Sequence, residues 1–178
     1  MPMALGEMLE SFDEYGARIP LDRLREGLEE LDLEFDDIKK YARFSESRYQ
    51  RNLLHAGPGY QALILCWRNG QRSPIHDHRG SSCGVCVLKG VATETVFDHA
   101  PNGMIYPMGT RELAVGGVTG SQDDDIHQVS NLQPNGADLV TLHIYSPPLL
   151  VMGTYSLTDP KREEVLDPIF DFAFGVGI

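Results

Sequence analysis

His76 and His78 are the residues of this sequence whose type and spacing point most directly to chemistry. Successive side chains of a β-strand alternate between its two faces, so both imidazoles would point the same way and could share one metal ion. A His-x-His pair by itself is more often structural or incidental than functional. The residues around the pair therefore have to decide between these interpretations.

The spacing around the two histidines forms a longer pattern. A glycine, five residues, His76, one residue, His78, four residues, Cys83, six residues and Gly90 follow one another in that order. This arrangement resembles the first motif of the cupin superfamily, with Cys83 at the position where many cupins carry a glutamate ligand. The resemblance covers both histidines and both flanking glycines.

A second cupin motif would supply a third histidine, and Gly116, His127 and Asn131 fall at its spacing, although Gln122 and Asp124 replace its usual proline and glycine. The plain alternative for His127 is a polar residue at the start of a strand. Three neutral imidazoles would leave the opposite side of an ion open, as a catalytic metal requires. A zinc-dependent hydrolase or isomerase and a non-catalytic cupin that binds a metal or small ligand both remain open.

The elements that would position these side chains fall into two parts. Residues 1 to about 45 are predicted to be helical, because Leu21, Leu24, Leu28 and Leu31 recur at helical spacing. From Tyr49 onward, short apolar runs are separated by turn residues, a texture typical of an all-β sandwich or barrel. The predicted strands are 60–67, 83–89, 92–97, 111–115, 126–130, 139–146 and 152–157.

Composition narrows the function classes. The chain has 178 residues and a formal charge of -11, which would repel nucleic acid and anionic lipid surfaces. The N-terminus lacks the basic start and apolar run of a secretory signal, and no stretch reaches the length of a membrane span. Three cysteines fit a reducing compartment better than a disulfide framework. We expect a cytoplasmic monomer without nucleic-acid or membrane partners.

The likeness to a family becomes specific over residues 49–148, where matching segments occur in order: Tyr49-Gln-Arg-Asn-Leu53, Leu65-Cys-Trp67, His76-Asp-His78, Cys83, Gly90, Glu94-Thr-Val-Phe97 and Leu142-His-Ile-Tyr-Ser-Pro-Pro148. These segments resemble an arginine-type bacterial member of the cysteine dioxygenase family. The resemblance implies a mainly β, single cupin-type β-barrel (jelly roll) with N-terminal helices. We expect residues 1–178 to form one domain, with a helical segment 1–45 packing on a barrel of residues 46–178.

The resemblance also implies an activity. An Fe(II) ion held by His76, His78 and His127 would convert L-cysteine and O2 to cysteine sulfinic acid, a step of cysteine catabolism. Arg51 stands where the cysteine-specific members place an arginine that pairs with the substrate carboxylate, and Tyr49 would line the same pocket. A guanidinium suits a bidentate carboxylate. The closest alternative substrates are 3-mercaptopropionate and cysteamine, and cysteamine has no carboxylate for Arg51.

Alternation along the strand 139–146 places Thr141, His143 and Tyr145 on one face. This polar face would simply meet water if the opposite aliphatic face packed the core. In the resembling family it looks into the barrel, with the tyrosine hydroxyl beside the iron, so the resemblance assigns catalytic roles to Tyr145, His143 and Cys83.

Cys83 occupies a position where some family members form a thioether bond to the active-site tyrosine, here Tyr145. A shift of register by one residue would place Gly84 there instead and remove the bond. The resemblance therefore implies a possible Cys83–Tyr145 crosslink. Cys86 would face the opposite side of the strand, where a buried free thiol packs in the core.

Overall fold

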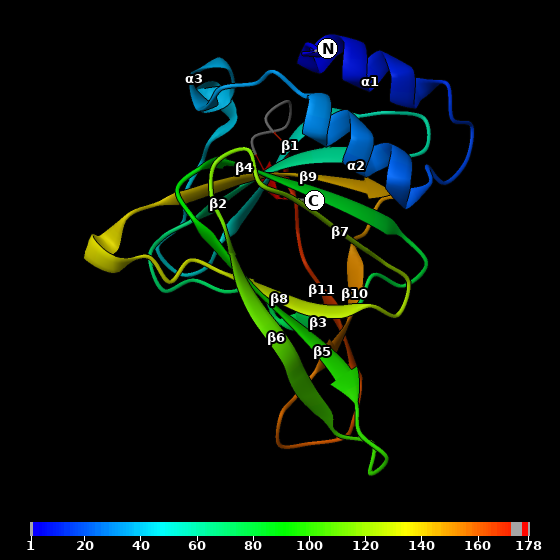
Figure 1. Cartoon of the computed structure of the whole chain (residues 1–178), viewed down its shortest axis with the longest axis vertical. Coiled ribbons are helices and arrows are strands. Elements are labelled where there is room, and N and C mark those ends of the chain that lie inside the picture. The colour runs from blue at the N-terminus through cyan, green and yellow to red at the C-terminus, as the bar shows by residue number, and fades with distance from the viewer. Residues whose placement is uncertain (1, 172–175, 178) are drawn as a thin grey trace.

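The computed structural model of the chain describes residues 2–171 and 176–177. Two β-sheets face each other, and the N-terminal helices cover the outer side of one of them (Figure 1). The helices are α1 (Leu5–Asp13), α2 (Leu21–Glu30), α3 (Phe35–Ile38) and the short 3-10 turns η1 (Lys39–Tyr41) and η2 (Pro134–Gly136). None of the helices in this described part of the chain has the length and apolar character required to cross a membrane.

The chain crosses repeatedly between the two sheets. In the described residues, one sheet has seven strands in the order β13-β12-β1-β2-β9-β4-β7, and the other has six in the order β11-β10-β3-β8-β5-β6. The strands are β1 (Gln50–Ala56), β2 (Gln61–Trp67), β3 (Ile75–His76), β4 (Ser82–Lys89), β5 (Ala92–His99), β6 (Ile105–Leu113), β7 (Val118–Gln122), β8 (Ile126–Ser130), β9 (Leu139–Ser146), β10 (Val151–Tyr155), β11 (Glu163–Leu166), β12 (Phe170–Asp171) and β13 (Val176–Gly177).

This architecture confirms the predicted fold class, a mainly β jelly roll with N-terminal helices. It differs in one respect, because the two sheets of the described residues stay separate and do not join into a closed barrel. The predicted strand 111–115 is the end of β6, which begins at Ile105, and the predicted strand 152–157 corresponds to β10. The predicted strands do not include β1, β3, β7, β11, β12 or β13.

The central strands of the larger sheet are buried on both faces. In β9, Val140, Leu142 and Ile144 pack in the cluster beneath the helices, whereas Tyr145 belongs to the cluster between the sheets. The polar row Thr141, His143 and Tyr145 is buried and does not meet water. The interior of the sandwich therefore combines an apolar lining with a row of polar side chains.

Helix α2 lies directly on β4 and β7 because glycines there leave room for it. A Cβ atom at Gly84 would come within 2.8 Å of a Leu28 methyl group and 3.1 Å of the Leu24 Cβ atom. Leu24 and Leu28 are buried in the cluster that joins the helices to the sheet. The apolar stripe predicted for residues 21–31 is therefore the face that anchors the helix.

Replacement of Leu24 by alanine tests this anchoring. Because the side chain is fully buried, we expect Leu24→Ala to lower the free energy of unfolding by about 2–5 kcal/mol, as measured by urea denaturation. Arg23→Ala, on the exposed side of the same helix, serves as the matched control and should change it by no more than about 0.5 kcal/mol. Equal, small effects of the two substitutions would show that α2 does not contribute its apolar face to the core.

Candidate metal centre and substrate pocket

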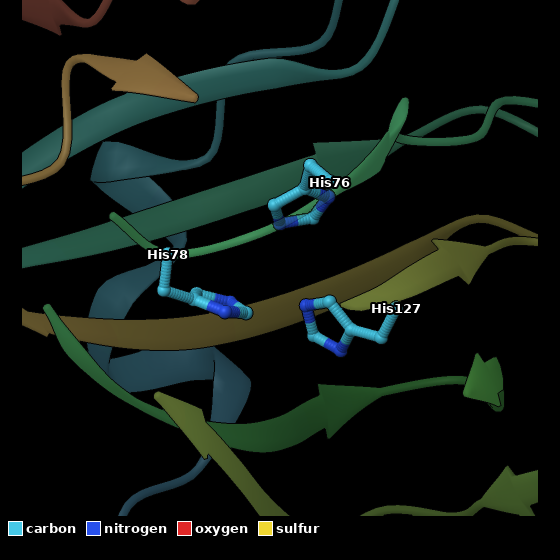
Figure 2. Close-up of side chains that lie close together, drawn as sticks. All are labelled: His76, His78 and His127. Carbon is cyan, nitrogen blue, oxygen red and sulfur yellow. The ribbon is translucent and has the colours of Figure 1, made fainter. Parts of the chain in front are cut away.

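Three histidines converge in the space between the sheets (Figure 2). His76 lies in β3 and pairs across the ladder with His127 in β8, while His78 follows β3 after one intervening residue. One ring nitrogen from each lies within 4.8 Å of the others, and all three side chains are buried. Among the residues that the structure describes, this is the one such cluster able to hold a metal ion.

Backbone carbonyls orient two of the rings. His76 Nδ1 lies 2.9 Å from the carbonyl oxygen of Pro74, and His78 Nδ1 lies 3.3 Å from that of Asp125. A carbonyl oxygen only accepts hydrogen bonds, so each Nδ1 carries the proton and donates it. The Nε2 lone pair of His76 is therefore available to a metal ion, and that of His78 accepts from the Ser121 hydroxyl over 3.2 Å, a contact that a bound ion would replace.

A buried carboxylate orients the third ring. His127 Nδ1 donates to Glu94 Oε1 over 2.8 Å, and the other carboxylate oxygen accepts from Arg111 Nε over 2.8 Å and from the Thr119 hydroxyl over 3.0 Å. Burial by itself would raise the pKa of Glu94, but the hydrogen bonds and charges of His127 and Arg111 lower it to about 2. Glu94 is thus an anion directly behind the His127 ring.

Burial keeps the imidazoles of His76 and His78 neutral. It lowers the pKa of His76 to about 3, with a further contribution from the charge of His127, and it lowers the pKa of His78 well below its ordinary value. A neutral imidazole retains the lone pair that binds metal, so neither ring needs to lose a proton at neutral pH. The donor set fits a divalent ion of the iron or zinc type.

A chain of hydrogen bonds runs along the polar face of β9. Trp67 Nε1 donates to Thr141 Oγ1 over 3.0 Å, Thr141 Oγ1 lies 2.9 Å from His143 Nε2, and His143 Nδ1 lies 3.0 Å from the Tyr145 hydroxyl. Because indole only donates, the buried Thr141 hydroxyl proton is satisfied when it is donated to Nε2. His143 then donates from Nδ1 to the Tyr145 oxygen, which leaves the Tyr145 proton free for another acceptor.

Cys83 lies directly opposite Tyr145 in the β4–β9 ladder. The thiol of Cys83 and the hydroxyl of Tyr145 interact, and burial raises the pKa of both groups. Gly84 pairs with Ile144 and faces Leu24 and Leu28 on the helix side. The register therefore sets Cys83, and not Gly84, beside the tyrosine.

Arg51 lies in the same interior on β1, with its residue only 2% exposed. Its Nη1 donates to the backbone oxygen of Asp167 over 2.5 Å and its Nη2 to that of Leu149 over 2.7 Å. The guanidinium carbon lies 5.3 Å from the centre of the Tyr145 ring. Tyr49 stacks on Trp67 at 4.3 Å between ring centres, and burial raises the pKa of its hydroxyl, which stays a donor.

The eight residues predicted from the sequence thus lie together between the sheets, supplied by β1, β3, β4, β8, β9 and the residues that adjoin β1 and β3. A cleft beside Glu94, Ser121 and His127 reaches the surface and offers a path to the metal centre. Sequence reasoning missed Glu94 as the partner of His127, and it missed the buried Asp167. Strand alternation places Glu94 on the same face as Ala92, and an acid on a face that turns inward is the signal that could have identified it.

A jelly roll of two sheets with three converging histidines between them defines a cupin-type metal-binding protein. The solved structure of TT1209 from Thermus thermophilus shares this fold, with a TM-score of 0.54 at 19% identity, covering 65% of this chain and 99% of that one. The family model of cysteine dioxygenase type I matches residues 17–158. The chain therefore belongs to the cysteine dioxygenase type I family, which confirms the predicted resemblance.

Individual relatives agree with this assignment. A protein of Rattus norvegicus named cysteine dioxygenase type 1 is 32% identical over 154 residues, which cover 83% of this chain and 76% of the relative. Its namesake in Danio rerio is 36% identical over 124 residues, which cover 67% of this chain and 61% of the relative. The chain thus matches about three fifths of the length of the Danio rerio protein.

Replacement of Glu94 by glutamine tests its role behind His127. The amide cannot provide the same anionic acceptor, so we expect Glu94→Gln to weaken metal binding by about 10–100-fold. The measurement is a chelator competition with Fe(II) and, separately, with Zn(II). Glu112→Gln, an exposed acid on β6, should leave the affinity unchanged. Wild-type affinity in Glu94→Gln would contradict the assignment.

Proposed function

We propose that the protein is a cysteine dioxygenase that converts L-cysteine and O2 to cysteine sulfinic acid at an Fe(II) ion held by His76, His78 and His127. The relatives named cysteine dioxygenase type 1 and the three-histidine cluster support this activity, and the relatives indicate a non-haem iron dioxygenase. The observation that carries the substrate assignment is the buried Arg51 beside this cluster.

Arg51 has hydrogen-bond donors that the protein does not use. A guanidinium has five N–H groups, and backbone oxygens accept two of those of Arg51. Its buried Nε has no hydrogen-bond partner among the residues that the structure describes. An unpaired donor on a buried cation is costly, and a substrate carboxylate would satisfy it. L-Cysteine offers a thiol for the metal and a carboxylate for Arg51 in one small molecule.

The ligand set suits a thiol substrate. When bound, Fe(II) would supply a coordination site for the thiolate and the redox chemistry that O2 requires. Imidazole ligands add no negative charge, so the charge of a divalent ion would stay unbalanced within the immediate ligand set, which favours an anionic thiolate. His127 would separate Glu94 from the ion, and Arg111 Nη2 neutralises the Glu94 carboxylate at a distance of 2.7 Å.

Tyr145 is the protein group that would act on the bound reactants. Its hydroxyl is held by His143, and its ring lies beneath the guanidinium of Arg51. We assign it the role of donating a hydrogen bond to oxygen or sulfur, with His143 and Cys83 as its supports. Burial raises the pKa of Tyr145 well above its ordinary value, so the hydroxyl keeps this proton.

The proposal extends to the domain organisation, oligomeric state, location and partners of the protein. Residues 1–178 act as one cupin domain in which the segment 1–45 supports the β-sheets of residues 46–178. The protein works as a cytoplasmic monomer on a small thiol and O2, without nucleic-acid or membrane partners. Its net charge of -11 supports the exclusion of polyanionic partners.

Oxygen uptake tests the proposed activity. Fe(II)-loaded protein should consume O2 with L-cysteine and form the sulfinate, and 3-mercaptopropionate should react with a lower kcat/KM. A preference for 3-mercaptopropionate would overturn L-cysteine as the substrate. Absence of uptake with either thiol would instead favour a non-catalytic cupin that binds metal. Zinc as the metal retained by protein purified without added metal would favour hydrolytic chemistry.

Replacement of Arg51 by alanine tests the carboxylate contact. Loss of a charge-assisted pair should raise the KM for L-cysteine by about tenfold or more. Arg72→Ala, which removes an exposed arginine four residues before His76, is the matched control and should leave KM unchanged. An unchanged KM in Arg51→Ala would remove its assigned role.

The Cys83–Tyr145 crosslink has its own test. Formation of the thioether replaces the Cys83 S–H bond and one Tyr145 ring C–H bond by an S–C bond, with O2 taking up the two electrons and two protons released, so we expect an intact mass about 2 Da below that of the sequence. The Cys83→Ser protein should show no such deficit in mass spectrometry. The same deficit in Cys83→Ser would exclude this pair as its source.

A further inference from the structure

Asp167 is a buried carboxylate, only 1% exposed, that lies just after β11. Its side chain accepts hydrogen bonds from the Tyr49 hydroxyl and from the guanidinium of Arg48. Its position lies beyond residues 17–158, the stretch that the family model matches. Asp167 therefore joins the pocket from a segment that the family match does not include.

The same residue also holds Arg51. The backbone oxygen of Asp167 accepts from Arg51 Nη1 over 2.5 Å, and its carboxylate lies 3.9 Å from Arg51 Nε. This second distance is too long for a hydrogen bond but short enough for electrostatic attraction. Asp167 thus contacts Tyr49 through its side chain and Arg51 through its backbone.

The charges of Arg48, Arg51 and Asp167 do not cancel one another. Two arginines, Arg48 and Arg51, face one carboxylate, which leaves one net positive charge. Without Asp167, the buried guanidinium of Arg51 would lose the anion beside it, which is costly, whereas the exposed Arg48 would still be solvated. With Asp167 in place, the remaining charge matches one substrate carboxylate.

We propose that Asp167 is a positioning residue for the substrate carboxylate, one that fixes the guanidinium of Arg51 and the ring of Tyr49. This inference rests on the proposed function, because it concerns the pocket assigned there to the carboxylate of L-cysteine. Asp167 itself does not touch the substrate. It acts through Arg51 and Tyr49: loss of its carboxylate would remove the hydrogen bond that holds Tyr49 and the negative charge beside Arg51 Nε, while backbone oxygens would still hold the two Nη atoms of Arg51.

The chain carries its own reporter for this position. Trp67 is the only tryptophan in the sequence, and its indole stacks on Tyr49 at 4.3 Å with an angle of 15° between the rings. Displacement of Tyr49 would change the surroundings of the indole. Fluorescence of Trp67 therefore reports on the role of Asp167 without depending on turnover.

The experiment compares wild type with Asp167→Ala and Asp167→Asn as Fe(II)-loaded proteins. We expect Asp167→Ala to raise the KM for L-cysteine about tenfold with kcat within about twofold, because binding geometry is lost and the metal site is not. Anaerobic Trp67 emission should shift to the red, since space beside Tyr49 admits water. Asp167→Asn keeps the shape and an oxygen acceptor, so it should show a smaller rise in KM than Asp167→Ala.

Glu163→Gln is the matched control, because Glu163 is an exposed acid of the neighbouring strand β11 whose carboxylate pairs with the exposed Lys161. It should keep wild-type KM and emission. Wild-type KM and emission in both Asp167 variants would overturn the inference, and so would a fall in KM, which would mean that Asp167 only repels the substrate. Failure of the proposed function is a separate result, in which wild type takes up no O2 with L-cysteine. The emission of Asp167→Ala then still decides whether Asp167 positions Tyr49.

Discussion

The short pairing of β3 with β8 is the constraint on which the metal centre depends, because it sets His76 directly opposite His127. β3 has only two residues, and the fully buried Asp77 that follows it fixes this segment in place. The Asp77 carboxylate accepts from the Tyr155 hydroxyl over 2.8 Å and from Arg162 Nε over 2.8 Å. The residue between the two ligands thus anchors the chain on one side while the imidazoles point to the other.

Two further buried carboxylates, Glu94 and Asp167, stand behind side chains of the proposed site. Glu94 stands behind the ligand His127 with Arg111 as its counter-charge, and Asp167 stands behind Tyr49 with Arg48. Burial of an isolated charge is costly, so each acid needs its cation close by. Both acids hold functional side chains and stay outside the set that would contact metal or substrate.

The sequence contained the ligands and the polar face of β9, because histidine spacing and strand alternation are local properties. It did not reveal β1 or β7 for physical reasons. The buried Arg51 and Asn52 of β1 donate side-chain hydrogen bonds to backbone oxygens. A hydrophobic pattern in the sequence does not reveal such buried polar residues. β7 carries Gly120 because α2 packs close to it. Partners distant in the chain, such as Asp167, depend on tertiary contacts and could not be predicted.

We propose that a three-histidine metal centre and a carboxylate pocket together allow both atoms of O2 to be transferred to the sulfur of L-cysteine. The most direct measurement is the isotope content of the product formed by Fe(II)-loaded protein under 18O2 in ordinary water. The account predicts cysteine sulfinic acid in which both sulfur-bound oxygens are heavy. A product with one heavy oxygen, or with oxygen taken only from water, would contradict it.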